Sequence, residues 1–315
     1  MESRYIKNVY LCTLLKFMEE KIIHRAGFVN ILGSPNVGKS TLMNALVGEN
    51  LSIITSKVQT TRHRIMGIVN GDDFQIVYSD TPGVIEKPNY KLHESMMGFV
   101  NAAIEDADIF LYVTEINGDH IHLPIIEKIK STGTPIIIVI NKIDLGDQGR
   151  LEERFEFWHN LLPDAFIFPI SALHKVHIDV LLNKLISLLP ESQAYFPKDE
   201  LTDKTMRFFV SEIIREKILL LYNKEIPYSS EVAIEAFKEG SERIDISATI
   251  FVMRESQKMI MLGKNGQAIK QLGIEARKDI EEFVGQHVYL DLTVKVAKDW
   301  RENEKSLKKF GYLES

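Results

Sequence analysis

The sequence predicts an α/β domain, with a mainly parallel sheet flanked by helices, followed by a smaller α+β domain. Apolar stretches of strand length alternate with amphipathic stretches up to about residue 189. The pattern G-x-x-x-x-G-K-[ST] lies at residues 33–40, between the first such strand and the first such helix. Beyond residue 203 the order becomes helix, strand, strand, helix, helix, strand. These observations together predict two domains of different architecture.

Composition sets outer limits on the function. The 315 residues are 45% hydrophobic and 26% charged, which is ordinary for a globular protein of two domains. No run approaches the roughly 18 consecutive apolar residues of a membrane-spanning helix. The single cysteine, Cys12, excludes an internal disulfide and a cysteine-based zinc site, as expected in the cytoplasm. The net charge of −6 arises before residue 203, so the chain is not uniformly basic like many nucleic-acid-binding proteins.

We divide the chain into four parts. Residues 1–21 precede the first predicted strand, and their apolar core at 10–15 is too short for a convincing signal peptide. We therefore expect an N-terminal extension, with Met18 as an alternative start of the protein. The other predicted parts are a nucleotide-binding domain at 22–189, a semi-extended linker at 190–203 and a second domain at 204–315.

The segment 33–40 has the pattern of a phosphate-binding P-loop, between a strand at 28–32 and a helix that begins near Thr41. Glycines at both ends let the backbone curl until its N–H groups point at phosphate oxygens, and the helix N-terminus adds partial positive charge. Lys39 is expected to reach the β- and γ-phosphates. The predicted phosphate-binding residues are Gly33, Asn36, Val37, Gly38, Lys39, Ser40 and Thr41.

Two later segments are predicted to sense the γ-phosphate. Residues 52–63 are polar and aperiodic, which indicates a loop that orders with a triphosphate; a threonine there, Thr61 in preference to Thr60, completes Mg²⁺ coordination. The predicted strands 64–69 and 74–79 lead to Asp80, placed to hold Mg²⁺ through water. The predicted metal ligands are thus Ser40, Thr61 and Asp80, and the predicted catalytic residues are Lys39, Thr61 and Gly83, whose N–H faces the γ-phosphate.

Val84 occupies the position after Gly83, where some GTPases carry a glutamine that orients the attacking water. An apolar side chain cannot do this. We therefore expect slow hydrolysis unless a partner, a backbone group of a switch or a monovalent cation such as K⁺ assists. Asn36 is a candidate cation ligand, and a loop-stabilising amide is an equally good reading of it.

The predicted strand 136–140 delivers the sequence Asn-Lys-Ile-Asp at 141–144, which selects the base. Guanine presents N1–H and N2–H₂ side by side, and the carboxylate of Asp144 can accept both, whereas adenine has no such pair of donors. Asn141 braces the loop, and Lys142 lays its methylene stem over the ring. After a short strand at 166–170, a backbone N–H of Ser171 or Ala172 can meet guanine O6. GTP is therefore expected rather than ATP.

The second domain has the element order of a KH domain of the bacterial type, type II. Its predicted elements are a helix at 204–222, strands at 231–238 and 243–253, helices at 256–262 and 267–284 and a strand at 287–296. A G-x-x-G loop joins the last two helices and lets a sugar-phosphate backbone approach. The predicted RNA-binding residues are Lys258, Gly263, Lys264, Asn265, Gly266 and Lys270.

The P-loop, Q-T-T-R-H-R, D-T-P-G, N-K-I-D and S-A-L, followed by S-E-I-I-R-E-K and K-D-W-R in a terminal KH domain, closely resemble the Era family of bacterial GTPases. The resemblance runs from about residue 27 to residue 313. It implies GTP hydrolysis with Mg²⁺, binding of the 3′ end of 16S ribosomal RNA and a role in assembly of the 30S subunit. It also implies a cytoplasmic monomer, with peripheral attachment to the inner membrane for some of the protein.

Two other functions are weighed beside this one. A passive RNA-binding ribosome factor would keep its nucleotide site only for structure, and the intact Lys39, Ser40, Asp80 and Asp144 argue against it. A tRNA-modifying GTPase would share the first half of the chain. It needs modification chemistry of its own, and the only cysteine precedes the nucleotide domain.

Overall fold

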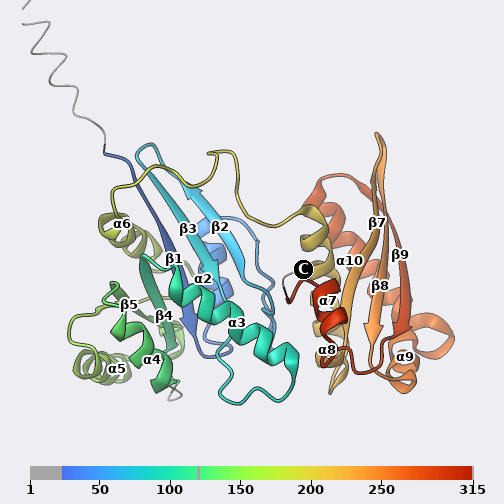
Figure 1. Ribbon diagram of the computed structural model, residues 1–315, viewed down its shortest axis with the longest axis horizontal. Coiled ribbons are helices and arrows are strands. Elements are labelled where there is room, and N and C mark those ends of the chain that lie inside the picture. Colours follow the sequence, from blue (N-terminus) through green and yellow to red (C-terminus); the bar gives the residue numbers. More distant parts are fainter. Residues whose placement is uncertain (1–22, 119–120, 314–315) are drawn as a thin grey trace, which may run out of the picture.

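The computed structural model describes residues 23–118 and 121–313. Two lobes, each built on its own sheet, lie side by side (Figure 1). The predicted extension at residues 1–21 lies outside the described residues. Among those described, no helix is both long and apolar enough to cross a membrane.

The first lobe contains a six-stranded sheet in the order β2-β3-β1-β4-β5-β6. Every neighbouring pair is parallel except β2 and β3, which are antiparallel because only a short turn joins them. The mainly parallel sheet predicted from the sequence is confirmed. The strands are β1 (Arg25–Gly33), β2 (Ile65–Asn70), β3 (Phe74–Asp80), β4 (Ile109–Glu115), β5 (Ile136–Asn141) and β6 (Phe166–Pro169).

Helices cover both faces of this sheet, as Figure 1 shows. Alternate residues of β4 point to opposite faces: Leu111 packs in the apolar cluster with α2 and α6, whereas Phe110 packs with α3, α4 and α5. This doubly covered arrangement explains why the central strands read as continuous apolar runs. The helices are α2 (Lys39–Val47), α3 (Lys91–Glu105), α4 (Leu123–Ser131), α5 (Gln148–Leu161) and α6 (Ile178–Leu188).

The second lobe has a three-stranded sheet in the order β7-β8-β9, with the first pair antiparallel and the second parallel. Residues of α7 and α10 share one apolar cluster with the strands. The predicted order is confirmed, and the short helices α8 and α11 are additions to it. The elements are α7 (Met206–Leu221), α8 (Ile226–Ser229), β7 (Glu231–Glu239), β8 (Arg243–Val252), α9 (Glu255–Leu262), α10 (Gln267–Val284), β9 (His287–Val296) and α11 (Glu304–Lys309).

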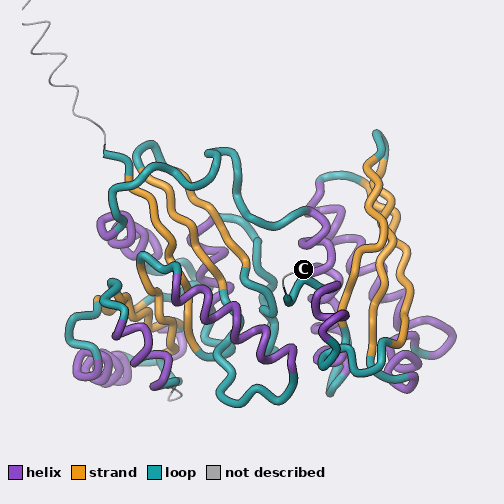
Figure 2. The backbone as a smooth tube through the Cα atoms, in the orientation of Figure 1, coloured by secondary structure: helices purple, strands orange, loops and turns teal. Residues whose placement is uncertain are grey.

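The segment between α6 and α7 runs along the edge of the first sheet before it crosses to the second lobe (Figure 2). The side chain of Gln75 accepts from the backbone N–H of Tyr195 at 2.7 Å and donates to the carbonyl of Phe196 at 2.8 Å. Further on, the N–H of Ile68 donates to the carbonyl of Leu201 at 2.8 Å. The segment is thus extended, but it is bound to the first domain over much of its length.

Candidate nucleotide site and interdomain contact

A cavity of about 490 Å³ opens at the carboxyl edge of the first sheet. This is the edge where loops of an open α/β sheet gather to bind ligands. Of the predicted site residues, Asn36, Gly38, Lys39, Ser40, Thr41, Thr61, Gly83, Asn141, Lys142, Asp144 and Ser171 line it. Gly33, Val37, Asp80 and Ala172 are not among the lining residues.

The P-loop needs its two fixed glycines for different contacts. Gly33 has φ of 146° and Gly38 has φ of 95°, values that side chains rarely tolerate. A Cβ atom on Gly33 would overlap the carbonyl of Val113, and one on Gly38 would overlap the amide of Asn141. The glycines therefore allow the loop to lie tightly between β4 and the loop after β5.

The side chain of Lys39 contacts the backbone of its own P-loop. Its Nζ donates to the carbonyls of Ser34 at 2.9 Å and Gly33 at 3.2 Å. Burial lowers the pKa of Lys39 to about 8, and the charge of Asp80 acts in the opposite direction. The side chain is an ammonium group held at the wall of the cavity, where it can meet a phosphate.

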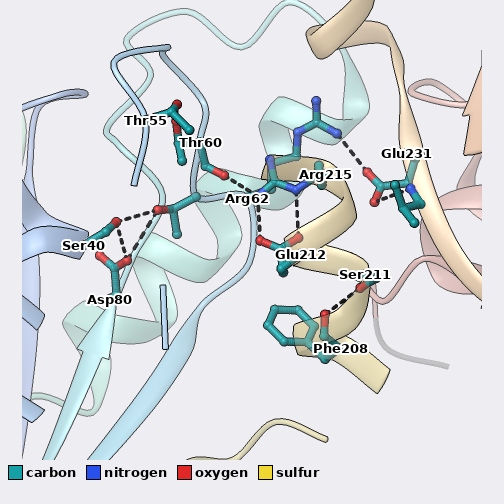
Figure 3. A network of polar contacts seen from close by, with 12 residues as sticks. Ser40, Thr55, Thr60, Arg62, Asp80, Phe208, Ser211, Glu212, Arg215 and Glu231 are labelled. Atoms are coloured by element: carbon teal, nitrogen blue, oxygen red, sulfur yellow. Dashed lines mark hydrogen bonds and ion pairs between the residues drawn. The ribbon is translucent and has the colours of Figure 1, made fainter. Parts of the chain in front are cut away.

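The side chains of Ser40 and Asp80 point toward each other (Figure 3), and the hydroxyl of Thr61 completes a cluster of three oxygen-bearing side chains. Ser40 Oγ donates to Asp80 Oδ2 at 2.7 Å and lies 2.9 Å from Thr61 Oγ1, which lies 3.4 Å from the same carboxylate oxygen. Asp80 is fully buried, burial raises its pKa, and its Oδ1 has no partner among the described residues. Two hydroxyls and a carboxylate with an unused oxygen are the donor set that Mg²⁺ prefers, so the residues present fit this ion.

Thr60 faces away from this cluster. Its Oγ1 donates to the carbonyl of Lys57 at 2.6 Å and lies 2.7 Å from Thr55 Oγ1. Its neighbour Thr61 is the one whose hydroxyl reaches Asp80. The geometry therefore favours Thr61 of the two threonines.

Asn141 ties the P-loop to the loop after β6, as its place after a buried strand suggested. Its Nδ2 donates to the carbonyl of Val37 at 2.9 Å, and its Oδ1 accepts from the N–H of Ala172 at 3.0 Å. Asp144 lines the cavity; one of its carboxylate oxygens accepts from the hydroxyl of Ser171 at 2.6 Å, and the other lies 3.8 Å from His174 Nε2.

Lys142 bridges the same loop to the P-loop. It has a left-handed backbone with φ of 59°, and its Nζ donates to the carbonyl of Asn36 at 2.7 Å and pairs with Glu115. Lys142 and Asn36 both line the cavity, so the methylene stem of Lys142 lies in the wall on which a purine ring would stack.

The loop after β6 differs in detail from the expectation. The N–H of Ala172 is bonded to Asn141, and the N–H of Ser171 donates to the carbonyl of Val176 at 3.3 Å. Both donors expected for guanine O6 are therefore used inside the protein, and a base would have to share or exchange these bonds. Contacts between loops that are distant in the sequence leave no local sequence pattern, so they could not be predicted from the sequence.

Val84 turns away from the cavity. Its side chain is 6% exposed and lies in the apolar cluster of Leu32 and Phe110. Its N–H donates to the carbonyl of Gly33 at 3.3 Å, which brings Gly83 against Pro35; a Cβ on Gly83 would lie 2.9 Å from the Pro35 Cα. Residues 83 and 84 therefore make backbone contacts with the P-loop, and the side chain of Val84 is not available to a water molecule in the cavity.

Sequence reasoning missed part of the cavity wall. The further lining residues are Pro35, Ile53, Ile54, Thr55, Ser56, Gln59, Thr60, Leu145 and Leu173. Most come from residues 52–63, hereafter the switch segment, a predicted loop in which only the threonines Thr60 and Thr61 had been considered individually. Gln59 is notable because its φ is 57° and its side-chain amide lies 2.9 Å from His93 Nε2 of α3.

The switch segment also contacts the second lobe (Figure 3). Arg62 is 1% exposed, and its guanidinium donates to the carbonyl of Pro227 at 3.0 Å, to that of Ser230 at 2.9 Å and to Glu231 Oε2 at 2.8 Å. From the other side, Arg215 of α7 donates to the carbonyl of Thr60. One segment thus lines the cavity and is buried against the second lobe.

Aromatic packing extends this contact. The ring of His63 stacks on Tyr312 with centroids 4.2 Å apart, and burial lowers the pKa of His63 to about 3, so the ring is neutral at neutral pH. Tyr312 Oη donates to Glu231 Oε2 at 2.7 Å. Nearby, Leu92 of α3 shares an apolar cluster with Trp300. The carboxyl-terminal part of the chain therefore packs on both the switch segment and α3.

The predicted RNA loop lies at the far end of the second lobe, beside α9 (Figure 1). Gly263 and Gly266 have φ of 72° and 74°, and Asn265 between them is also left-handed. Lys264 and Lys270 are exposed, and no described carboxylate pairs with either. The side chain of Met259 nearby is 63% exposed, so the loop carries charge beside apolar surface.

Comparison with known proteins agrees with both lobes. A model for a 50S ribosome-binding GTPase matches residues 28–142, and a model for a KH domain matches residues 225–301. GTPase Era of Syntrophus aciditrophicus (strain SB) is 48% identical over 298 residues, covering 93% of this chain and 97% of the relative. GTPase Era of Staphylococcus haemolyticus (strain JCSC1435) is 42% identical, covering 92% and 98%.

The chain belongs to the Era family of GTPases. A crystal structure of Era in complex with MgGDPNP and nucleotides 1506–1542 of 16S ribosomal RNA superposes with a TM-score of 0.87 at 38% identity, covering 92% of this chain and 99% of that one. A variant of Aquifex aeolicus Era bound to GDP·AlF4⁻ gives the same TM-score and identity, covering 91% and 99%. The Era family was the resemblance drawn from the motifs, and it is confirmed.

Proposed function

We propose that this chain is a GTP-hydrolysing switch that binds the 3′ end of 16S ribosomal RNA through its KH domain and acts in assembly of the 30S subunit. The observation that carries the proposal is the double role of the switch segment. Thr61 faces Asp80 in the nucleotide cavity, and the next residue, Arg62, is buried against Glu231 of the KH domain. The proposal treats residues 22–189 and 204–315 as two functional units joined by 190–203.

In this proposal the cavity holds GTP or GDP with Mg²⁺. Ser40 and Thr61 ligate the ion directly, Asp80 holds it through water, and Lys39 contacts the β- and γ-phosphates. Asp144 accepts from guanine N1–H and N2–H₂. Support comes from the solved Era that holds MgGDPNP and from the unused Oδ1 of Asp80. When bound, Mg²⁺ neutralises charge that develops on the transferred phosphoryl group.

Hydrolysis transfers the γ-phosphoryl group to water. A water oxygen bonds to the γ-phosphorus, the bond from that phosphorus to the β–γ bridging oxygen breaks with its electron pair leaving on GDP, and the water proton leaves with inorganic phosphate. Lys39 and the N–H of Gly83 stabilise the charge on the γ-phosphate oxygens, and Thr61 closes the switch segment over them.

A monovalent cation such as K⁺ is a further element of the proposal. Asn36 Nδ2 donates to the carbonyl of Ser56 at 3.1 Å, so the Asn36 side chain lies against the switch segment, and rotation of its amide would turn the oxygen toward the same carbonyl to share a cation. Turnover that is faster in KCl than in NaCl, with the difference lost in Asn36→Ala, is the expected result. Equal rates in the two salts would leave Asn36 with a loop-stabilising role only.

For RNA, the proposal assigns the sugar-phosphate backbone to Gly263, Lys264, Asn265 and Gly266, with Lys258 and Lys270 beside them. Side-chain charge without a carboxylate partner favours phosphate, and the exposed apolar surface at Met259 suits unstacked bases. The solved Era with nucleotides 1506–1542 of 16S ribosomal RNA supports the choice of RNA. We further propose a cytoplasmic monomer with peripheral attachment to the inner membrane for some of the protein.

Two measurements test the proposal together. Phosphate release should occur over multiple turnovers with GTP and not with ATP, and an RNA of the 16S 3′ end should bind more tightly than a scrambled RNA at equal salt. RNA binding without turnover would favour a passive RNA-binding factor. Turnover without preference for the 16S sequence would remove the assigned partner.

A further inference from the structure

At position 84 the site offers no polar side chain that could orient the attacking water. Water attack on GTP benefits from a group that orients the water, and Val84 is packed into the core. This inference rests on the proposed GTP hydrolysis and names a residue for it. A polar side chain in the cavity wall, close to Thr61 and Gly83, is what the chemistry requires.

Gln59 meets this requirement. It lines the cavity together with Thr61 and Gly83. Its φ of 57° is a left-handed conformation that a residue with a long side chain rarely adopts. In addition, one end of its buried carboxamide has no partner among the described residues. A strained backbone and an unsatisfied amide in one residue of the cavity wall indicate a functional role.

His93 fixes which end of that carboxamide is free. The backbone N–H of Asn89 donates to His93 Nδ1 at 3.3 Å, so Nδ1 carries no proton. The ring is neutral because burial lowers the pKa of His93 to about 4, and its proton is therefore on Nε2. Nε2 must donate to the Gln59 atom 2.9 Å away, which is then the oxygen, and the NH₂ occupies the end without a partner.

We propose that the carboxamide of Gln59 is the catalytic group that orients the attacking water, and that His93 is the residue that positions it. Gln59 Oε1 accepts from His93 with one lone pair and from the water with the other. The NH₂ donates to an oxygen of the transferred γ-phosphoryl group. The carboxamide takes up no proton, so the water proton still leaves with inorganic phosphate.

The central test is Gln59→Gly, because glycine adopts the left-handed backbone freely and the substitution removes the side chain, carboxamide included, without adding backbone strain. Single-turnover hydrolysis should slow roughly 10- to 100-fold, the effect of losing one hydrogen bond to a charged group. Affinity for a GTP analogue should be unchanged. A second readout does not depend on turnover. Aluminium fluoride should tighten GDP binding to the unmodified chain, and this tightening should be lost in Gln59→Gly. Asp299→Gly, at an exposed left-handed residue remote from the cavity, is the matched control.

His93 is tested with two substitutions. His93→Leu removes the donor and should slow hydrolysis nearly as much as Gln59→Gly, with no further loss in the double variant. His93→Gln retains an amide donor and should restore part of the rate. Nitrogen-15 shifts of His93 in the nucleotide-free protein should show the proton on Nε2.

The outcomes separate this inference from the proposed function. If the unmodified chain neither binds nor hydrolyses GTP, the proposed function and this inference fall together. If the unmodified chain hydrolyses GTP and Gln59→Gly does so equally fast, with aluminium fluoride still tightening GDP, only the role of Gln59 is overturned. A proton on Nδ1 of His93 would overturn the role given to His93.

Discussion

Arg62 of the switch segment and Glu231 at the start of β7 form a buried ion pair, with 2.8 Å between Nη1 and Oε2 and side chains that are 1% and 6% exposed. The two residues belong to different domains, and Arg62 follows a residue in the nucleotide cavity. A change in the path of the switch segment must therefore move or break this pair. Together with the contact of Arg215 on Thr60, the pair links the wall of the nucleotide cavity to the KH domain.

Breaking one partner of this pair should be costly. Glu231→Gln leaves the Arg62 guanidinium buried without its carboxylate, and we expect the free energy of unfolding to fall by about 3 kcal/mol. Urea denaturation measures this loss. The double variant Arg62→Met/Glu231→Leu removes both charges and should recover most of the stability. A double variant that is as unstable as Glu231→Gln would show that the charges themselves stabilise the interface.

Asp144→Asn should change the nucleotide preference. The amide can donate to the 2-oxo group of xanthine but cannot accept both guanine donors, so GTP affinity should fall and affinity for xanthosine triphosphate should rise. Competition with a fluorescent nucleotide gives both affinities. Undiminished GTP affinity would remove Asp144 from base recognition.

The G-x-x-G loop allows a clean test of RNA contact at Gly266. A Cβ there meets no atom within 4 Å, whereas a Cβ on Gly263 would lie 2.6 Å from Ala268 Cβ. Gly266→Asp should therefore abolish most RNA affinity through charge and backbone strain while GTP binding survives. Gly263→Asp should in addition destabilise the KH domain, so it is the poorer probe. RNA affinity that survives in Gly266→Asp would place the RNA elsewhere.

The pH dependence of stability should report His93. Its pKa lies near 4 in the folded protein, against an ordinary value of 6.5, because of burial and then the charges of Arg301 and Arg62. Between these values the unfolded chain binds a proton that the folded chain does not, so stability is lost as pH falls from 6.5 to 4. The free energy of unfolding should fall more steeply in this window for the unmodified chain than for His93→Gln. Parallel curves would contradict the assignment.

The sequence predicted the nucleotide domain well for a physical reason. Each motif there combines a buried strand with a loop at its end, and apolar runs such as 136–140 mark the strand while Asn141 and Asp144 mark the loop. α5 was not predicted from the sequence. Its large buried side chain is Trp158, while Phe155 and Phe157 are exposed, so its apolar residues do not follow the helical period that would mark a buried face.

The interdomain contact could not be predicted from the sequence. Arg62 and Glu231 lie far apart in the chain, and neither stands in an apolar pattern that would show burial. Their pairing depends on how the second domain docks, which is set by packing of Trp300 and Tyr312 on α3 and the switch segment. Gln59 was missed for a similar reason, since its partner His93 comes from α3.

The most direct test of the account is RNA affinity measured with a GTP analogue and with GDP, in the unmodified chain and in Arg62→Met/Glu231→Leu. The account predicts different RNA affinities in the two nucleotide states of the unmodified chain, with RNA shifting the ratio of the two nucleotide affinities by the same factor, as linkage requires. The difference should shrink in the double variant. Equal RNA affinities in both nucleotide states of the unmodified chain would contradict it and leave two independent domains on one chain.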